Sequence, residues 1–229
     1  MFLRILCLAA ASVSLAFLVS FPDAISALAS DGMLASLYAE LSLPLPTTGL
    51  IVACHGFGCE YRTEIRLTAA DRTRLGAIMA IGRSAPAAER RAVAAAVSWL
   101  DRRVGPGAGT THRVARAGAH ESRDPGQMDC IDISANNTSL FLVLDQLHLL
   151  HHHRVEPPVS RGIILDMRLP HTTAVLEEIK SGQDWAIDNW THPYGELPDI
   201  EPLEQWKSGR DWERYSPAHA DQSQREGTS

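Results

Sequence analysis

Hydrophobic and polar residues alternate with changing periods along the chain, and these changes predict a mixture of helices and strands. Short runs of apolar and β-branched residues predict strands, whereas apolar residues spaced three or four apart predict helices. The predicted strands are residues 49–54, 61–67, 162–166, 171–179 and 184–190. The predicted helices are residues 69–81 with Thr68 as N-cap, 87–103 with an end at Gly105, and 131–152. The pattern favours the α+β class.

Prolines, glycines and small polar residues interrupt these elements. Pro44 and Pro46 predict irregular structure over residues 30–48. Residues 105–126 predict a long loop, which either forms a wall of a functional site or lies on the surface. The run 136–138, Asn-Asn-Thr, predicts a second N-cap that divides the third helix into two pieces. Several prolines after the last predicted strand indicate extended segments.

The first 29 residues have the pattern of an export signal. Arg4 precedes an apolar run at 5–19, which is shorter than the roughly 20 residues of a membrane span. The small residues Ala27 and Ala29 on either side of position 28 predict cleavage before Ser30, so we expect a periplasmic or secreted protein with no membrane attachment afterwards. An uncleaved N-terminal anchor is the alternative. The expected organisation is a signal peptide at 1–29, one domain at 30–215, and a disordered polar tail at 216–229.

Composition narrows the possible partners. The chain has 229 residues with 45% hydrophobic content, which is sufficient for a domain with a substantial core. Its net charge is -6 and its basic residues are scattered. A nucleic-acid-binding surface is therefore not expected.

Three cysteines remain after removal of the predicted signal. Cys54 and Cys59 are separated by only four residues, two of them glycines, and predict a local disulfide in an oxidising compartment. The same pair with His55 is an incomplete metal site, which is the alternative. A disulfide between Cys54 and Cys59 leaves Cys130 as the free thiol.

Cys130 lies where a glycine-led loop ends and a helical pattern begins. The start of a helix presents unpaired amide groups and a positive dipole end, which stabilise a thiolate. Downstream, a turn at 180–183 joins the last two strands into a hairpin that carries His171 and Asp188. A thiol, an imidazole and a carboxylate in this order predict a cysteine catalytic triad. The oxyanion donor is expected to be the backbone amide of Cys130 or the side-chain amide of Gln127.

Three blocks resemble the transglutaminase-like superfamily, which shares the papain-like core. They are Cys130 at a helix start, a His heading the apolar strand 171–176, and a Trp-x-x-Asp block at 185–188, with 17 positions between the His and the Asp. Within that superfamily the chain looks most similar to bacterial transglutaminase-like cysteine proteinases. The resemblance covers about residues 126–190 and leaves the segment 54–59 unexplained.

The resemblance implies a function and a set of partners. It implies an α+β papain-like domain that hydrolyses or transfers an amide through a thioester, using Cys130, His171 and Asp188. It implies no metal and no organic cofactor. The substrate would be an amide in a protein, a peptide or peptidoglycan, in the cell envelope.

Other interpretations of the same residues stay open. Cys130 is a core cysteine in the simplest alternative, and the neighbouring Asp129 and Asp132 act against a thiolate. His148, His151 and His152 share helical spacing and form either a metal set or, with the next histidine, a polar helix end. Several tryptophans near the C-terminus either line a groove or pack in the core. A non-catalytic envelope protein that uses the fold for binding or scaffolding is the alternative function.

Overall fold

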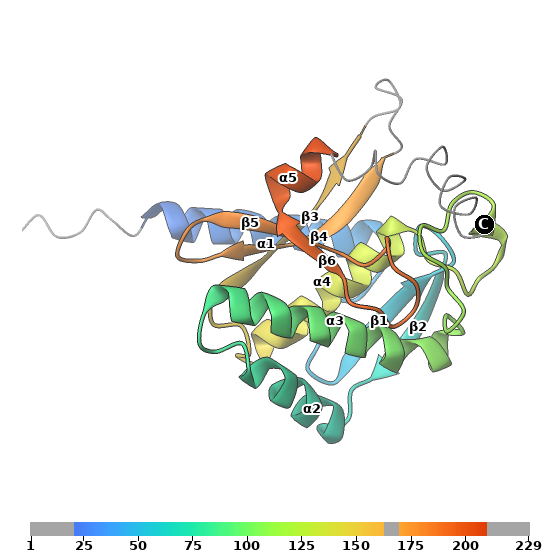
Figure 1. Cartoon of the computed structure of the whole chain (residues 1–229), viewed down its shortest axis with the longest axis horizontal. Coiled ribbons are helices and arrows are strands. Elements are labelled where there is room, and N and C mark those ends of the chain that lie inside the picture. Colours follow the sequence, from blue (N-terminus) through green and yellow to red (C-terminus); the bar gives the residue numbers. More distant parts are fainter. Residues whose placement is uncertain (1–20, 163–169, 210–229) are drawn as a thin grey trace, which may run out of the picture.

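The computed structural model describes residues 21–162 and 170–209, which form helices and two antiparallel sheets (Figure 1). The helices are α1 (Phe21–Glu40), α2 (Ala69–Ala80), α3 (Pro86–Ala108), α4 (Cys130–Gln146) and α5 (Leu203–Ser208), with a short 3-10 turn at Glu121–Arg123. The strands are β1 (Leu50–His55), β2 (Tyr61–Arg66), β3 (His153–Arg161), β4 (His171–Glu178), β5 (Gln183–Asp188) and β6 (Asp199–Pro202). The α+β class is confirmed.

The two sheets have different sizes. β1 and β2 form a hairpin of their own, whereas β3, β4, β5 and β6 form an antiparallel sheet in chain order. The predicted turn at 180–183 joins β4 to β5, and Ala174 pairs with Ile187 in that hairpin. Across the described residues no helix combines the length and the apolar character that a bilayer crossing needs.

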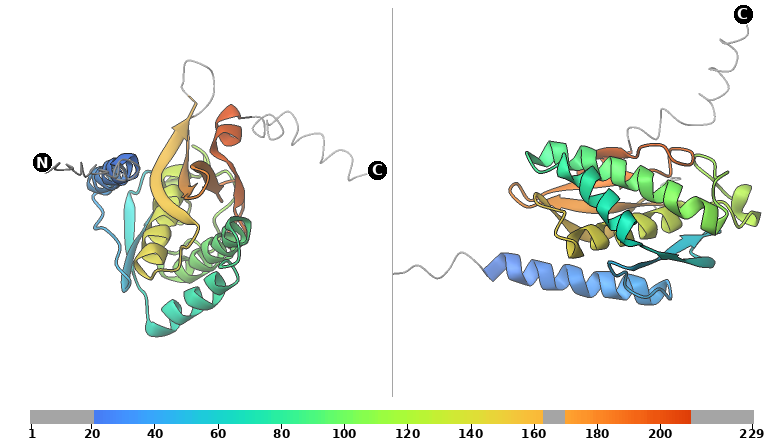
Figure 2. Two further views of the ribbon diagram at one scale, coloured as in Figure 1. Left: turned by 90° about the vertical axis from the view of Figure 1, so that its left-hand side faces the viewer. Right: turned by 90° about the horizontal axis from the view of Figure 1, so that it is seen from below.

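Helix α4 is the central element. It contacts β1 on one side and the strands β3 and β4 on the other. In both views of Figure 2, α4 lies between α1 and α3, which run along opposite sides of the molecule. Its apolar residues Leu140, Phe141 and Leu144 are fully buried in the main core, together with Leu176 of β4. The core therefore holds the second half of α4 against the larger sheet.

The predicted irregular structure at 30–48 is wrong for its first part. Helix α1 continues to Glu40 because Leu34 and Tyr38, four positions apart, are both buried against the body. The Tyr38 hydroxyl also forms a 2.7 Å hydrogen bond with Ser139 of α4. The helix ends at Glu40, and the irregular segment that contains Pro44 and Pro46 begins only after it.

The predicted end of the second long helix at Gly105 is also wrong. Helix α3 continues through Pro106 to Ala108 and ends at Gly109, which has a left-handed φ of 73°. A proline cannot donate to the carbonyl four residues before it, which is that of Arg102. The Tyr194 hydroxyl donates to this carbonyl instead, at 3.2 Å. A residue of a distant loop thus supplies the hydrogen bond that Pro106 cannot donate.

The predicted second N-cap at 136–138 does not form, because α4 is one uninterrupted helix. The two asparagines are buried and bond to other elements. Asn136 accepts a hydrogen bond from the Cys54 amide at 2.7 Å and donates to the Cys54 carbonyl at 2.9 Å. Asn137 donates to the side-chain oxygen of Asn189 at 2.8 Å. Both asparagine side chains thus bond to residues far away in the sequence and do not cap a helix.

The predicted helical structure at 147–152, which precedes Pro157 and Pro158, is wrong as well. Helix α4 stops at Gln146, and His153 already begins strand β3. The two prolines lie inside β3, where the pairing with β4 shifts between Glu156 and Val159. A bulge accommodates prolines because the extra residues need no ladder hydrogen bond.

Three predictions fall wholly or mostly outside the described residues. They concern the signal segment up to residue 20, the strand at 162–166 and the polar tail from 216. The predicted extended segments after residue 190 contain β6 and the short helix α5, which the sequence pattern did not predict.

Candidate active site

Cys130 occupies the first helical position of α4. Asp129 is the N-cap, and its side chain accepts a hydrogen bond from the Asp132 amide at 2.9 Å. The Asp132 side chain accepts from the Asp129 amide in return, at 3.1 Å, which completes a capping box. An amide at the first position has no acceptor within its own helix, so the Cys130 amide faces outward beside its sulfur.

The other two described cysteines are joined to each other. Cys54 and Cys59 form the predicted disulfide, and Cys130 is the free cysteine of the described chain. Cys130 is partly exposed, whereas its candidate partners are buried. A partly exposed sulfur is the arrangement that a nucleophile requires, because a substrate must reach it.

His171 and Asp188 come together at the end of the β4–β5 hairpin. The pairing of Ala174 with Ile187 places Asp188 opposite residue 173, so His171 lies two positions further along on the same side of the strand. His171 Nε2 lies 2.5 Å from Asp188 Oδ2. Their side chains are 3% and 4% exposed, so this pair is shielded from water.

The side chain of Cys130 lies close enough to His171 to raise the pKa of the imidazole. Because Nε2 is directed to Asp188, Nδ1 is the ring nitrogen that remains for the sulfur. The structure therefore brings together Cys130, His171 and Asp188, which are far apart in the sequence, with the imidazole between the other two.

The three comparisons with known proteins find nothing similar. No family model matches the chain, and neither a curated protein nor a solved structure matches it. The family resemblance of the three sequence blocks stays a prediction, and the chemistry of the site rests on its own geometry.

Asp188 is held by three donors. Besides His171, the indole Nε1 of Trp206 donates to Oδ2 at 3.1 Å, and the Trp190 amide donates to Oδ1 at 3.1 Å. Burial raises the pKa of Asp188, but the charge of His171 and these hydrogen bonds outweigh burial and lower it. Asp188 is therefore ionised at neutral pH and fixed in orientation.

The electrostatics favour a charged imidazole. Burial lowers the pKa of His171, but the charge and hydrogen bond of Asp188, followed by those of Cys130, raise it to about 9. A protonated imidazole at neutral pH beside a sulfur matches the thiolate–imidazolium pair of cysteine nucleophiles.

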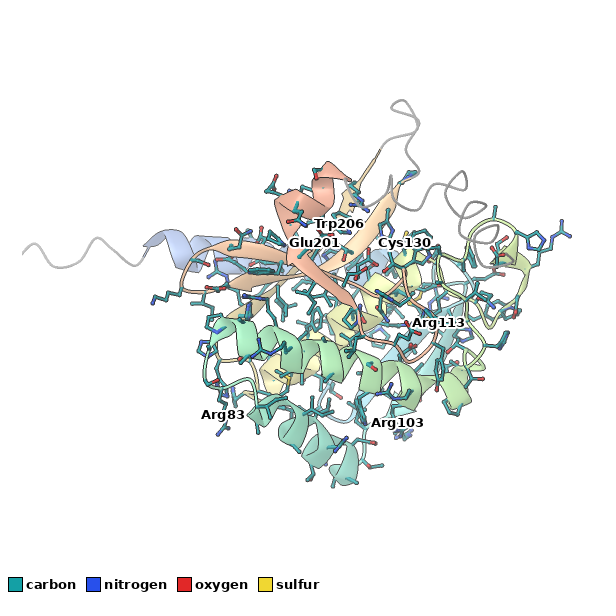
Figure 3. The ribbon with its side chains drawn as sticks, viewed as in Figure 1. Arg83, Arg103, Arg113, Cys130, Glu201 and Trp206 are labelled. Carbon is teal, nitrogen blue, oxygen red and sulfur yellow. A yellow bond between two sulfur atoms is a disulfide. The ribbon has the colours of Figure 1, made fainter. Side chains whose placement is uncertain are left out.

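Two tryptophans enclose the imidazole. The ring of His171 lies 4.6 Å from that of Trp190 and 5.4 Å from that of Trp206, measured between centroids. Figure 3 labels Trp206 on α5 and Cys130 at the start of α4. The guanidinium of Arg161 lies over the Trp206 ring at 4.2 Å from its centroid. The sequence suggested groove-lining tryptophans but gave no means of assigning Trp206 to Asp188.

The long loop before Cys130 is fastened to the segment that follows β5. Arg113 forms a buried ion pair with Asp101 of α3, with the closest contact at 2.6 Å, and also donates to the His192 carbonyl at 2.8 Å. The Arg116 amide donates to the Trp190 carbonyl at 2.7 Å. Of the two interpretations of this loop, the structure supports a wall beside the site.

Gln127 lies in that loop and its side chain is engaged there. Its Oε1 accepts a hydrogen bond from the Val114 amide at 2.9 Å, and its Nε2 donates to the His112 carbonyl at 3.3 Å. This amide thus braces the loop. A role for Gln127 as oxyanion donor stays a prediction, and the Cys130 amide is the better placed group.

The described residues do not arrange the cysteine and histidine side chains that the sequence suggested as metal ligands into a metal site. Among the described residues, the one cluster with potential metal ligands close together is Cys54, Cys59 and Asp132, and its two sulfurs are bonded to each other. His55 bonds instead to the Pro125 carbonyl and to a threonine hydroxyl.

The histidine run 148–153 lies beyond the end of α4, so its members do not share a helical face. The backbone amides of His151 and His152 donate to the buried carboxylate of Glu89. Nδ1 of His153 lies 2.9 Å from the same carboxylate. These contacts tie the α4–β3 connection to α3, which is a structural role.

Proposed function

We propose that this protein is a cysteine-dependent amide hydrolase or acyl transferase with Cys130 as nucleophile, His171 as acid and base, and Asp188 as the residue that orients His171. The observation that carries the proposal is the placement of the His171 ring between the Asp188 carboxylate and Cys130. A helix that begins with the cysteine and packs on an antiparallel hairpin carrying the other two supports a papain-like core of the transglutaminase-like type.

The first half of the reaction forms a thioester. The Cys130 sulfur attacks the carbonyl carbon of the amide, and the carbonyl oxygen takes the negative charge. The Cys130 amide, at the positive end of α4, is positioned to donate to that oxygen. The protonated His171 then transfers its proton to the leaving amine as the carbon–nitrogen bond breaks.

The second half of the reaction releases the acyl group. His171, now neutral, removes a proton from a water molecule or from an acceptor amine, which attacks the thioester carbon. The sulfur leaves as a thiolate beside the reprotonated imidazole, so the starting pair is restored. Asp188 keeps Nε2 of the ring protonated and directed away from the sulfur throughout.

The proposed substrate is an amide in a protein, a peptide or peptidoglycan, reached after export. Cleavage after Ala29 would retain the residues of α1 that contact the rest of the domain. These residues include Ser30, whose hydroxyl donates to Glu156 at 2.5 Å, and the buried Leu34 and Tyr38. Mass measurement of the exported protein would show a chain that begins at Ser30.

The test is the reactivity of Cys130. Iodoacetamide at neutral pH should label the Cys130 peptide, identified by mass spectrometry, and His171→Ala should slow labelling on the order of 10²-fold. Acyl-transfer probes built on small peptide and muropeptide amides should form a thioester on Cys130 that is absent in Cys130→Ser. If folded protein with an intact thiol does not react, the enzyme proposal fails and the non-catalytic envelope protein remains.

A further inference from the structure

The loop between β1 and β2 has an unusual backbone. Its four consecutive residues Gly56, Phe57, Gly58 and Cys59 all have left-handed φ values, of 80°, 70°, 63° and 60°. Two of them are not glycine, and the left-handed region is unfavourable for residues with a Cβ atom. Such a conformation persists only when surrounding contacts impose it. Here the Cys54–Cys59 disulfide closes the loop from one side.

The amide groups of this loop point to the capping box of the helix that carries Cys130. The amides of Phe57 and Cys59 donate to the two carboxylate oxygens of Asp132, at 2.8 and 2.6 Å. The Gly58 amide donates to the Asp129 carboxylate at 3.0 Å. Each carboxylate of the capping box is therefore shared between α4 and the disulfide loop.

The loop also holds the chain on the other side of Cys130. The Gly56 amide donates to the Gln127 carbonyl at 2.8 Å. Cys130 is thus bracketed by contacts at position 127 before it, at Asp129 next to it, and at Asp132 after it. The four contacts are all made by consecutive residues of one loop.

Asp132 depends on these donors. It is fully buried, and burial followed by the charge of Asp129 raises its pKa to about 7, against the hydrogen bonds of the Cys59, Phe57 and Asp129 amides. Loss of the loop amides would leave two neighbouring carboxylates with fewer donors. The capping box would then rearrange, and the first turn of α4 would move with it.

We propose that the Cys54–Cys59 disulfide holds the loop in the conformation that positions Cys130 against His171, with Asp132 as the positioning residue that transmits this restraint. The inference rests on the proposed function of Cys130. Its consequence is a redox dependence opposite to that of a simple thiol enzyme. A reductant that opens the Cys54–Cys59 bond lowers the reactivity of Cys130 although the nucleophile itself is a thiol.

The first experiment reduces the disulfide reversibly in the whole protein. A water-soluble trialkylphosphine takes up the oxygen of water and is oxidised to its phosphine oxide, while Cys54 and Cys59 each gain a hydrogen. After removal of the phosphine, the rate of iodoacetamide labelling is followed on the Cys130 peptide alone. We expect labelling to slow at least about tenfold and to recover after reoxidation.

The second experiment keeps the disulfide and changes the residue that transmits its effect. Asp132→Asn cannot accept all of its hydrogen bonds, so we expect a comparable slowing and a changed pH profile of labelling. Asp145→Asn, an exposed change on the same helix, is the matched control and should label at the wild-type rate. A merely structural role would lower the folded fraction but leave the pH profile of the folded protein unchanged.

The outcomes separate this inference from the proposed function. If untreated wild-type protein does not label at Cys130, the proposed function fails. If it labels, and either reduced protein that remains folded by circular dichroism or folded Asp132→Asn labels at the same rate and with the same pH profile, the positioning inference is overturned. Should reduction unfold the protein, Asp132→Asn decides the question.

Discussion

At the scale of single residues, Asp188 is the group on which the geometry of the candidate site depends. It receives hydrogen bonds from His171, from the Trp206 indole and from the Trp190 amide, and these donors come from three different segments. Because the carboxylate is fixed by two donors besides the imidazole, it determines where the ring lies and which nitrogen faces Cys130. In the proposed reaction, Asp188 therefore acts through His171.

Asp188→Asn should reduce the labelling rate of Cys130 at neutral pH on the order of 10²-fold. The change removes the charge that contributes most to raising the pKa of His171 to about 9. The pH limit above which the imidazole loses its proton should accordingly move to lower pH. The measurement is the rate of labelling between pH 6 and 10.

Asp199→Asn is the matched control for that change. Asp199 pairs with Asp188 across β5 and β6, but it is largely exposed and contacts Thr191 and His192 instead of the triad. This variant should keep the wild-type profile. An unchanged profile in Asp188→Asn would contradict the orienting role.

At the scale of elements, the site depends on how α4 is fastened between the two sheets. Asn136 of α4 pairs with both the amide and the carbonyl of Cys54, as a neighbouring strand would. It therefore closes the outer edge of β1. Asn137, the next residue, donates to the side-chain oxygen of Asn189, which directly follows Asp188 in sequence. Two adjacent polar residues thus connect one helix to both sheets.

Asn136→Ala should lower the free energy of unfolding by roughly 2–4 kcal/mol, because it leaves a buried amide and a buried carbonyl unpaired. Urea unfolding followed by circular dichroism measures this change. The exposed substitution Asp145→Ala on the same helix should change stability by less than about 0.5 kcal/mol. A loss below about 1 kcal/mol for Asn136→Ala would show that water replaces the asparagine.

At the scale of the whole molecule, buried side-chain pairs connect elements that are far apart in the sequence. Arg113 and Asp101 join the long loop to α3, with side chains 1% and 6% exposed. His153 and Glu89 join β3 to α3 in the same way. The buried pair of His171 and Asp188 makes the stability of the fold dependent on pH, because the pKa of His171 is raised in the folded protein.

We expect the protein to lose stability as the pH rises from about 6.5 to 9. The pKa of His171 is 6.5 in an unfolded chain and about 9 in the folded protein. The folded state therefore binds this proton more tightly, so its stabilisation is complete below pH 6.5 and is lost as the pH passes 9. The expected loss is on the order of 3 kcal/mol.

Urea unfolding at pH 6, 7.5 and 9.5 tests this dependence. The raised pKa of Asp132, at about 7, acts in the same direction but mostly below this range, between its ordinary value and pH 7. Asp188→Asn should flatten the decline between pH 7.5 and 9.5, because His171 then loses its charged partner. A decline of wild-type size in that variant would assign the effect to other groups.

The amino-acid sequence by itself determined the features that depend on residues close together in the chain. The Cys54–Cys59 loop, the Thr68 cap of α2, the β4–β5 hairpin and the start of α4 at Cys130 all follow from local spacing. The hairpin also fixes the distance along the chain between His171 and Asp188. These predictions succeed because turns, caps and short loops are governed by neighbouring residues.

Only the tertiary structure decided which distant groups meet. The two asparagines that predicted a cap instead bond from α4 to Cys54 and to Asn189. Helix α3 continues through Pro106, and the Tyr194 hydroxyl donates to the Arg102 carbonyl. The Trp206 indole donates to Asp188. Each of these outcomes satisfies a polar group that the local pattern leaves open, through a partner many residues away. A buried donor or acceptor must find a partner, but the sequence does not say which one, because that choice depends on how the whole chain packs.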